Sequence, residues 1–170
     1  MNHYARPDAE AFRAVMQQHA AAVTIVTALL DGRFHGVTAT AFSSVSADPP
    51  SVLVCINRNA GAHRAFSTAR HFCVNLLAAD QTELAARFSS SDESVRRRRF
   101  DDVPLGTLVT GAPTIKGALG HIDCDVVSVM ECKTHTVFIG LAVGIACNDQ
   151  QAAPLLYMTR QYGSFAPLSA

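Results

Sequence analysis

The sequence predicts a mainly β fold with helical insertions, in which antiparallel strands form a closed or nearly closed barrel. Most apolar runs are short or alternate with polar residues, as strands do. The turns between them are short, which suits antiparallel pairing. Three helical patterns interrupt the strands without alternating regularly with them, which argues against a parallel α/β sheet. We expect the whole chain, residues 1–170, to form a single domain that buries its own core.

The first elements are a helix and a strand pair. The helix begins near Asp8, a suitable N-cap, and its apolar stripe at spacings of three and four predicts that it packs on the body of the fold. The stripe consists of Phe12, Val15, Met16 and His19. Residues 21–30 then alternate, and Asp31 with Gly32 gives the tight turn before the strand at Arg33.

Residues 35–57 are the stretch best suited to hold a flat ligand. A strand of small and hydroxyl residues runs through Thr40 into a kinked segment at 42–44, so backbone groups are accessible beside an apolar wall. After a turn at 48–50, the apolar run 52–56 predicts a strand buried on both faces. Taken alone, the first strand fits a half-buried edge strand better than a binding site.

The middle of the chain predicts two helices and a strand. The polar loop 57–63 leads into a short helix, and the N–H groups at such a junction can bind an anion. A strand follows at 71–77, and Asp80 with Glu83 has capping-box spacing at the start of the next helix. Residues 89–102 include four consecutive arginines, partly neutralised by nearby carboxylates, and predict a mobile or partner-contacting loop, not a nucleic-acid patch.

The last third predicts strands. They cover residues 107–109, 118–132, 135–147 and 154–158, with a turn at 111–113. In the strand 135–147 one face is rich in glycine and alanine, which predicts close approach by a helix or a second subunit.

Composition excludes several classes of function. Fourteen basic and fourteen acidic residues give zero formal net charge, so neither nucleic acid nor a membrane surface is an expected partner. The five cysteines include no Cys-x-x-Cys and predict reduced thiols in a cytoplasmic protein without disulfides. The seven histidines show no metal-ligand spacing, so no metal is expected. No signal peptide and no run long enough to span a bilayer is present.

Motifs of nucleophilic hydrolases, P-loop proteins and Rossmann dinucleotide sites are also absent. Several segments of this sequence, taken in their order along the chain, resemble the short-chain flavin reductases. These are the reductase components of two-component flavin-dependent monooxygenases. The resemblance covers almost the whole chain, from about Phe12 to Tyr162. It rests on the segments 38–46, 48–50, 52–57, 72–77, 135–140 and 154–157.

The resemblance implies a six-stranded Greek-key FMN-binding split barrel, a homodimer, and ping-pong or sequential hydride transfer from NADH or NADPH to FMN, or FAD in some members. The reduced flavin would pass to a separate oxygenase. His135 matches the histidine where the nicotinamide enters and is the predicted catalytic residue, with Tyr157 near the ring or the dimer contact. Two further sets are implied for the flavin: Thr40, Ala41, Phe42 and Ser43 at the ring edge, and Cys55, Ile56, Asn57, Arg58, Asn59 and His63 along the ribityl chain and phosphate.

The residues themselves are compatible with this chemistry. A flat ring needs an apolar wall and backbone hydrogen-bonding groups, and hydride transfer requires stacking, not an acid or base of tuned pKa. One departure is that Lys133 and Thr134 precede His135 where the family has Gly-Asp. Two alternatives remain open: a reductase that retains its flavin and reduces a corrinoid, quinone or metal chelate, and a non-catalytic flavin-binding protein. A lone histidine such as His135 is also most often structural.

Overall fold

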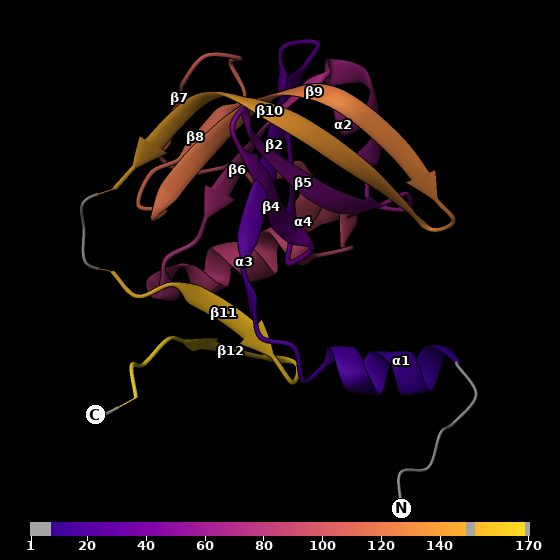
Figure 1. The fold of residues 1–170 in the computed structure, drawn as a ribbon. Coiled ribbons are helices and arrows are strands. Elements are labelled where there is room, and N and C mark those ends of the chain that lie inside the picture. Colours follow the sequence, from indigo (N-terminus) through magenta and orange to yellow (C-terminus); the bar gives the residue numbers. More distant parts are fainter. Residues whose placement is uncertain (1–7, 149–151, 169–170) are drawn as a thin grey trace, which may run out of the picture.

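The computed structural model describes residues 8–148 and 152–168, and strands are their commonest secondary structure (Figure 1). The part of the chain before residue 8 lies outside this description. The helices are α1 (Ala9–Met16), α2 (His63–Ala69), the 3-10 helix η1 (Ala79–Gln81), α3 (Thr82–Ser89) and α4 (Glu93–Arg97). The strands are β1 (Ala21–Ala22), β2 (Thr24–Leu30), β3 (Arg33–Ala39), β4 (Phe42–Ala47), β5 (Pro50–Asn57), β6 (His71–Leu76), β7 (Leu105–Thr107), β8 (Pro113–Ile115), β9 (Gly120–Cys132), β10 (His135–Cys147), β11 (Leu155–Met158) and β12 (Gln161–Ser164).

The main sheet has the strand order β3-β2-β6-β9-β10-β5-β4, and each neighbouring pair is antiparallel. Its two outer strands, β3 and β4, are consecutive in the chain and separated only by Thr40 and Ala41. When they are taken as one strand with a kink, the sheet has six strands and curves almost back onto itself. This arrangement fits the predicted split barrel.

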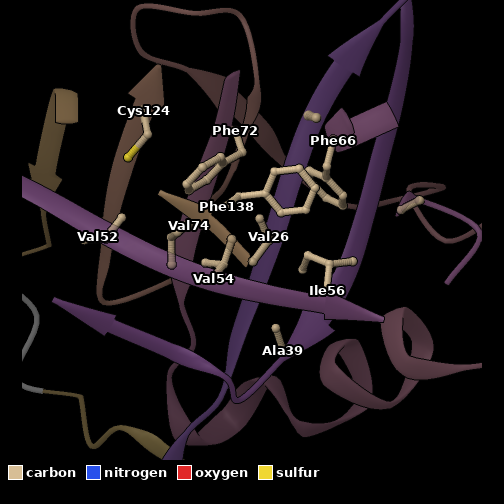
Figure 2. Close-up of a cluster of buried hydrophobic side chains, with 12 residues drawn as sticks. Val26, Ala39, Val52, Val54, Ile56, Phe66, Phe72, Val74, Cys124 and Phe138 are labelled. Carbon is tan, nitrogen blue, oxygen red and sulfur yellow. The ribbon is translucent and has the colours of Figure 1, made fainter. Parts of the chain in front are cut away.

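The inner face of the curved sheet buries the main apolar core (Figure 2). Phe72 and Phe138 come from β6 and β10, and Phe66 of α2 packs beside Phe138 with ring centroids 6.3 Å apart. Val26 and Val54 are also completely buried there. A second cluster lies under α3 and includes Val23, Ile25, Ala85, Phe88 and Ile115.

A buried polar network links the second cluster to the sheet. Asn75, a polar residue in the otherwise apolar middle of β6, donates from Nδ2 to the Ile25 carbonyl at 2.9 Å. Its Oδ1 accepts from the backbone N–H of Ile115 at 2.8 Å and lies 2.9 Å from Nδ1 of His121. Asn75 therefore satisfies buried groups on three strands at once.

Two local expectations, for the strand 52–56 and for the first helix, are corrected by the structure. The strand 52–56 is buried on one face only, because Leu53 and Cys55 are half-buried and alternate with buried neighbours. Helix α1 has the predicted N-cap, with the Asp8 carboxylate accepting from the N–H groups of Glu10 and Ala11. It buries none of its residues against the chain, however, and Phe12 is 66% exposed. Figure 1 shows α1 lying apart from the main sheet.

Residues 89–102 include a helix where a loop was expected. They contain α4, whose first turn is capped by the Asp92 carboxylate, and Arg99 is buried. The expected capping box at Asp80 and Glu83 is wrong, because the Gln81 side chain accepts from the Ala78 N–H instead. The arginine run is therefore part of the folded body.

The Gly and Ala face of β10 points inward, and α2 packs on it through Phe66 and Phe138, so of the two expected covers, a helix or a second subunit, the structure supports the helix. A Cβ on Gly140 would lie 2.6 Å from the Phe72 ring and 2.7 Å from Cβ of Cys124. The opposite face of β10 is the exposed one, and Ile145 is 63% exposed there.

No helix among the described residues is long and apolar enough to cross a bilayer.

The end of the chain forms a hairpin where the sequence predicted one short strand. Strand β11 pairs with both β1 and β12, so the C-terminal hairpin lies against β1 near the other end of the described chain. Thr159 and Arg160 form its turn with positive φ angles. The expected strand 107–109 is shifted, because β7 ends at Thr107.

Candidate functional site

A cavity of about 560 Å³ opens beside the kink between β3 and β4. Its lining includes the kinked segment 40–43, Leu53 and Cys55 of β5, and Tyr157 of β11. The volume falls in the range of small-molecule and cofactor sites. Residues from the first half of the chain and from its last hairpin therefore meet at one place.

The kink itself follows from the backbone pairing around Thr40 and Ala41. The N–H of Phe42 donates to the Thr40 carbonyl at 3.0 Å, and the N–H of Cys55 donates to the Ala41 carbonyl at 2.9 Å. Phe42 then packs against the main core, while Ser43 is exposed opposite Leu53. The chain thus changes partner strand at this point and leaves small side chains at the cavity wall.

The outer face of the sheet extends the site beyond this cavity. In the pairing of β5 with β10, Cys55 lies opposite Val137 and Asn57 lies opposite His135. Residues two apart on a strand share a face, so Cys55, Asn57 and His135 point to the same side of the sheet. His135 is half-buried, and its Nδ1 lies 2.9 Å from the Thr134 hydroxyl.

The loop after β5 is held in shape by local contacts. The Asn57 side chain accepts from the Asn59 N–H at 2.9 Å, and the Arg58 N–H donates to the Thr134 carbonyl at 2.9 Å. The Arg58 guanidinium pairs with Glu131 at 3.0 Å, with both side chains largely exposed. An exposed ion pair contributes little stability, so Arg58 remains available to a ligand.

His63 faces the interior and not the cavity. Its Nε2 lies 2.8 Å from the Thr136 hydroxyl, and its ring lies beside Phe138. Burial lowers the pKa of His63, and the nearby charge of Arg58 lowers it further. Ile56 also points into the core and is 2% exposed. If either residue serves a ligand, it does so by supporting neighbouring backbone.

The predicted site residues thus separate into three groups. One group lines the cavity, a second shares its sheet face or the adjoining loop, and a third points inward. The first contains Thr40, Ala41, Phe42, Ser43, Cys55 and Tyr157, the second Asn57, Arg58, Asn59 and His135, and the third Ile56 and His63.

Sequence reasoning missed the part of the cavity that comes from the two ends of the described chain. Arg13 and Met16 of α1, His19, and Arg160 of the β11–β12 turn all line it. Among the residues that the structure describes, the lining contains these two arginines and one histidine but no carboxylate. The unpartnered apolar stripe of α1 was the only sequence signal, and it did not indicate which surface α1 would face.

Cys55 gives the cavity wall a neutral thiol. Burial raises its pKa, and the proximity of Cys132 raises it further. Both effects disfavour the thiolate at neutral pH. Cys55 therefore contributes an apolar surface, as the flat face of an aromatic ring system requires.

Comparison with known proteins gives one consistent result. Residues 16–166 match the family model described as the flavin reductase like domain. The reductase component of 4-nitrophenol 4-monooxygenase/4-nitrocatechol 2-monooxygenase from Rhodococcus opacus is 37% identical over 160 residues, which are 94% of this chain and 83% of that protein. The FMN reductase (NADH) RutF 2 of Methylorubrum extorquens is 41% identical over 154 residues, covering 91% of this chain and 88% of that protein.

Solved structures agree with these matches. An NADH:FAD oxidoreductase from Streptomyces globisporus C-1027, solved in complex with NAD and FAD fragments, superimposes with a TM-score of 0.87. It is 28% identical, and the match covers 98% of each chain. Because the family match spans nearly all of the described residues and both curated relatives exceed 30% identity over most of the chain, this protein belongs to the flavin reductase family.

Proposed function

We propose that this flavin reductase transfers a hydride from NADH or NADPH to FMN or FAD held in the cavity beside the β3–β4 kink, and that it supplies the reduced flavin to a separate oxygenase. The main observation in its support is that the segment 40–43, predicted to contact the edge of the flavin ring, lines one open cavity together with Cys55 and Tyr157. The relative from Rhodococcus opacus is the reductase component of a monooxygenase, which supports a separate partner for this chain.

The bound flavin supplies the hydride acceptor, so the protein has to bind and stack the two reactants. Leu53 and Cys55 provide an apolar wall, and the kinked backbone at 40–43 provides hydrogen-bonding groups at its edge. Arg13 and Arg160 give the cavity a positive potential, which favours phosphate-bearing ligands. The loop 57–59 is the proposed contact of the flavin phosphate.

His135 is proposed to position the nicotinamide. It lies on the same sheet face as Cys55 and precedes by two residues Val137, the residue of β10 that lies opposite Cys55. At about 3.3 Å per residue, this places the backbones roughly 7 Å apart along the strand, which suits a coenzyme stacked over a ring in the cavity.

A steady-state assay tests the proposal. The purified chain is mixed with NADH or NADPH and with FMN or FAD in all four combinations, and coenzyme oxidation is followed at 340 nm with an oxygen-free control. Oxidation that rises with added free flavin and saturates supports the proposal. No flavin-dependent oxidation in any combination contradicts it.

We further propose a homodimer in which a second copy covers two exposed apolar surfaces. One is the stripe of α1, where Val15 is 71% exposed, and the other is on β9 near its turn into β10, where Val127 and Val129 are 59% and 51% exposed. Large exposed apolar patches are typical of interfaces. The near-zero net charge also favours association.

Sedimentation analysis tests the dimer. The parent protein is expected at twice the chain mass of 18.1 kDa. A Val15→Lys, Val129→Lys double variant should shift toward the monomer, whereas Ala86→Lys on the exposed side of α3 should not. A monomeric parent protein at micromolar concentration contradicts the proposal.

We also propose a cytoplasmic location for this protein, which the five free thiols support.

A further inference from the structure

A second cavity, of about 540 Å³, shares no lining residue with the cavity beside the kink. Its walls come from the start of β3, the loop before α2, and the segment around α4. We call it the arginine cavity, and it is lined by Arg33, Phe34, His35, Gly36, Gly61, Ala62, Glu93, Arg96, Arg97 and Arg99.

The charge of this lining is strongly positive. Four guanidinium groups face a single carboxylate, that of Glu93. Glu93 pairs with Arg96 at 3.3 Å and with Arg97 at 3.1 Å. Among the described residues, Arg33 and Arg99 have no carboxylate at ion-pair distance. The cavity therefore holds an excess of positive charge that only a bound anion would neutralise.

Arg99 is the most informative member of the lining. It is 7% exposed, and its Nη1 and Nη2 donate to the carbonyls of Gly36 and Ser90. Its Nε is buried and has no hydrogen-bond partner among the described residues. A buried charge without a counter-ion is costly, so a negative charge bound in the cavity would stabilise the Arg99 guanidinium.

Arg96 is placed by the shape of the backbone opposite it. A Cβ on Gly61 would lie only 1.3 Å from the Arg96 Nη2 atom, so the guanidinium occupies the space that any larger residue would fill. His35 lies close to the same positive charges. Burial lowers the pKa of His35, and the charges of Arg33 and Arg99 lower it further. The charge of Asp31 raises this pKa. The positive groups are thus built into the fold at this point.

We propose that the arginine cavity binds the pyrophosphate group of a nucleotide. Several guanidinium groups facing one small volume match the two adjacent phosphates of a pyrophosphate, with its several acceptor oxygens. FAD and the nicotinamide coenzymes both carry this group. Only the choice between these nucleotides rests on the proposed function, since the anion site itself is independent of flavin reduction.

Calorimetric titration of the full chain with inorganic pyrophosphate tests the site. Arg33→Gln and Arg96→Gln should each weaken binding by about tenfold or more, because each removes a charge-assisted hydrogen bond. Gly61→Ala should weaken it as well, since it displaces Arg96 without changing any charge. Thermal melting of each variant establishes that it is folded.

Arg98→Gln is the matched control, because Arg98 belongs to the same run of arginines but does not line the cavity. It should change the affinity by less than about twofold. The site is refuted if the parent protein binds no pyrophosphate, if the Arg33 and Arg96 variants bind it as the parent does, or if Arg98→Gln weakens binding equally.

Competition identifies the nucleotide. Displacement of pyrophosphate by FAD but not by NADH assigns the cavity to the flavin, and the reverse result assigns it to the coenzyme. Displacement by neither overturns the assignment to a nucleotide. A failed site with flavin-dependent coenzyme oxidation intact would refute this inference alone and leave the proposed function standing.

Discussion

Cys55 shows how one residue reports on the occupancy of the cavity. Its thiol lies in the wall and its pKa is raised, chiefly by burial, whereas Cys132 and Cys147 are exposed. Because alkylating reagents attack the thiolate, Cys55 should react more slowly than Cys147 with iodoacetamide at pH 8. Peptide mass spectrometry over a time course measures both rates.

Adding saturating FMN sharpens this first prediction. A ring bound against β5 covers Cys55, so its alkylation should slow by a further several-fold while that of Cys147 is unchanged. Equal protection of both thiols, or no protection of Cys55, would place the flavin elsewhere.

His135 carries the second prediction at this scale. Replacement by alanine should raise KM for the nicotinamide coenzyme by roughly two- to tenfold, the cost of one hydrogen bond, and leave the Kd for FMN unchanged. Steady-state kinetics and fluorescence titration of FMN give the two values. Thr134→Ala, which removes the contact to Nδ1 of His135, should have a smaller effect in the same direction. An unchanged KM in the His135 variant contradicts the positioning role.

At the scale of the element, β10 determines how closely the sheet can pack on its own core. Gly140 lies against Phe72 and Cys124 with no room for a Cβ, whereas nothing lies within 4 Å of a Cβ on Gly163 in β12. Gly140→Ala should therefore lower the free energy of unfolding by about 1–3 kcal/mol through overpacking. Gly163→Ala, the control, should change it by less than about 0.5 kcal/mol. Urea denaturation compares the two, and equal effects would mean that β10 has space to move.

Helix α1 and the terminal hairpin show that elements at opposite ends of the chain complete one site. The sequence predicted α1 and its N-cap because both depend on near neighbours in the chain. It did not predict that Arg13 and Arg160 face the same cavity, because that contact joins α1 to a turn far away in the sequence.

The whole molecule is expected to be most stable between about pH 6.5 and pH 9. Burial lowers the pKa of His35, His63 and His121 below their ordinary value of 6.5, so the unfolded chain binds more protons than the folded one as the pH falls below 6.5. Burial also raises the pKa of Cys124 to about 12, so the folded chain retains a proton that the unfolded chain loses above pH 9.0. The free energy of unfolding should therefore fall as the pH drops below 6.5 and as it rises above 9.0.

Urea denaturation at pH 5.5, 7.5 and 9.5 measures this profile. His121→Gln should reduce the fall in the free energy of unfolding between pH 7.5 and pH 5.5. It removes a histidine whose pKa is lowered by burial and that contacts Asn75 in the buried network. A free energy of unfolding that stays constant or rises between pH 7.5 and 5.5 would contradict the prediction.

The sequence alone determined the mainly β class, the order of most strands and the family resemblance, because alternation, turn residues and ordered motifs are local patterns that survive without knowledge of packing. It also predicted that the segment 40–43 contacts a ligand, and the structure places this segment in the wall of a cavity. Only the tertiary structure decided that the glycine and alanine face of β10 points inward, that Ile56 and His63 face the core, and that Arg99 is buried. A periodic pattern shows which residues share a face, but the neighbour that covers this face comes from a distant part of the chain.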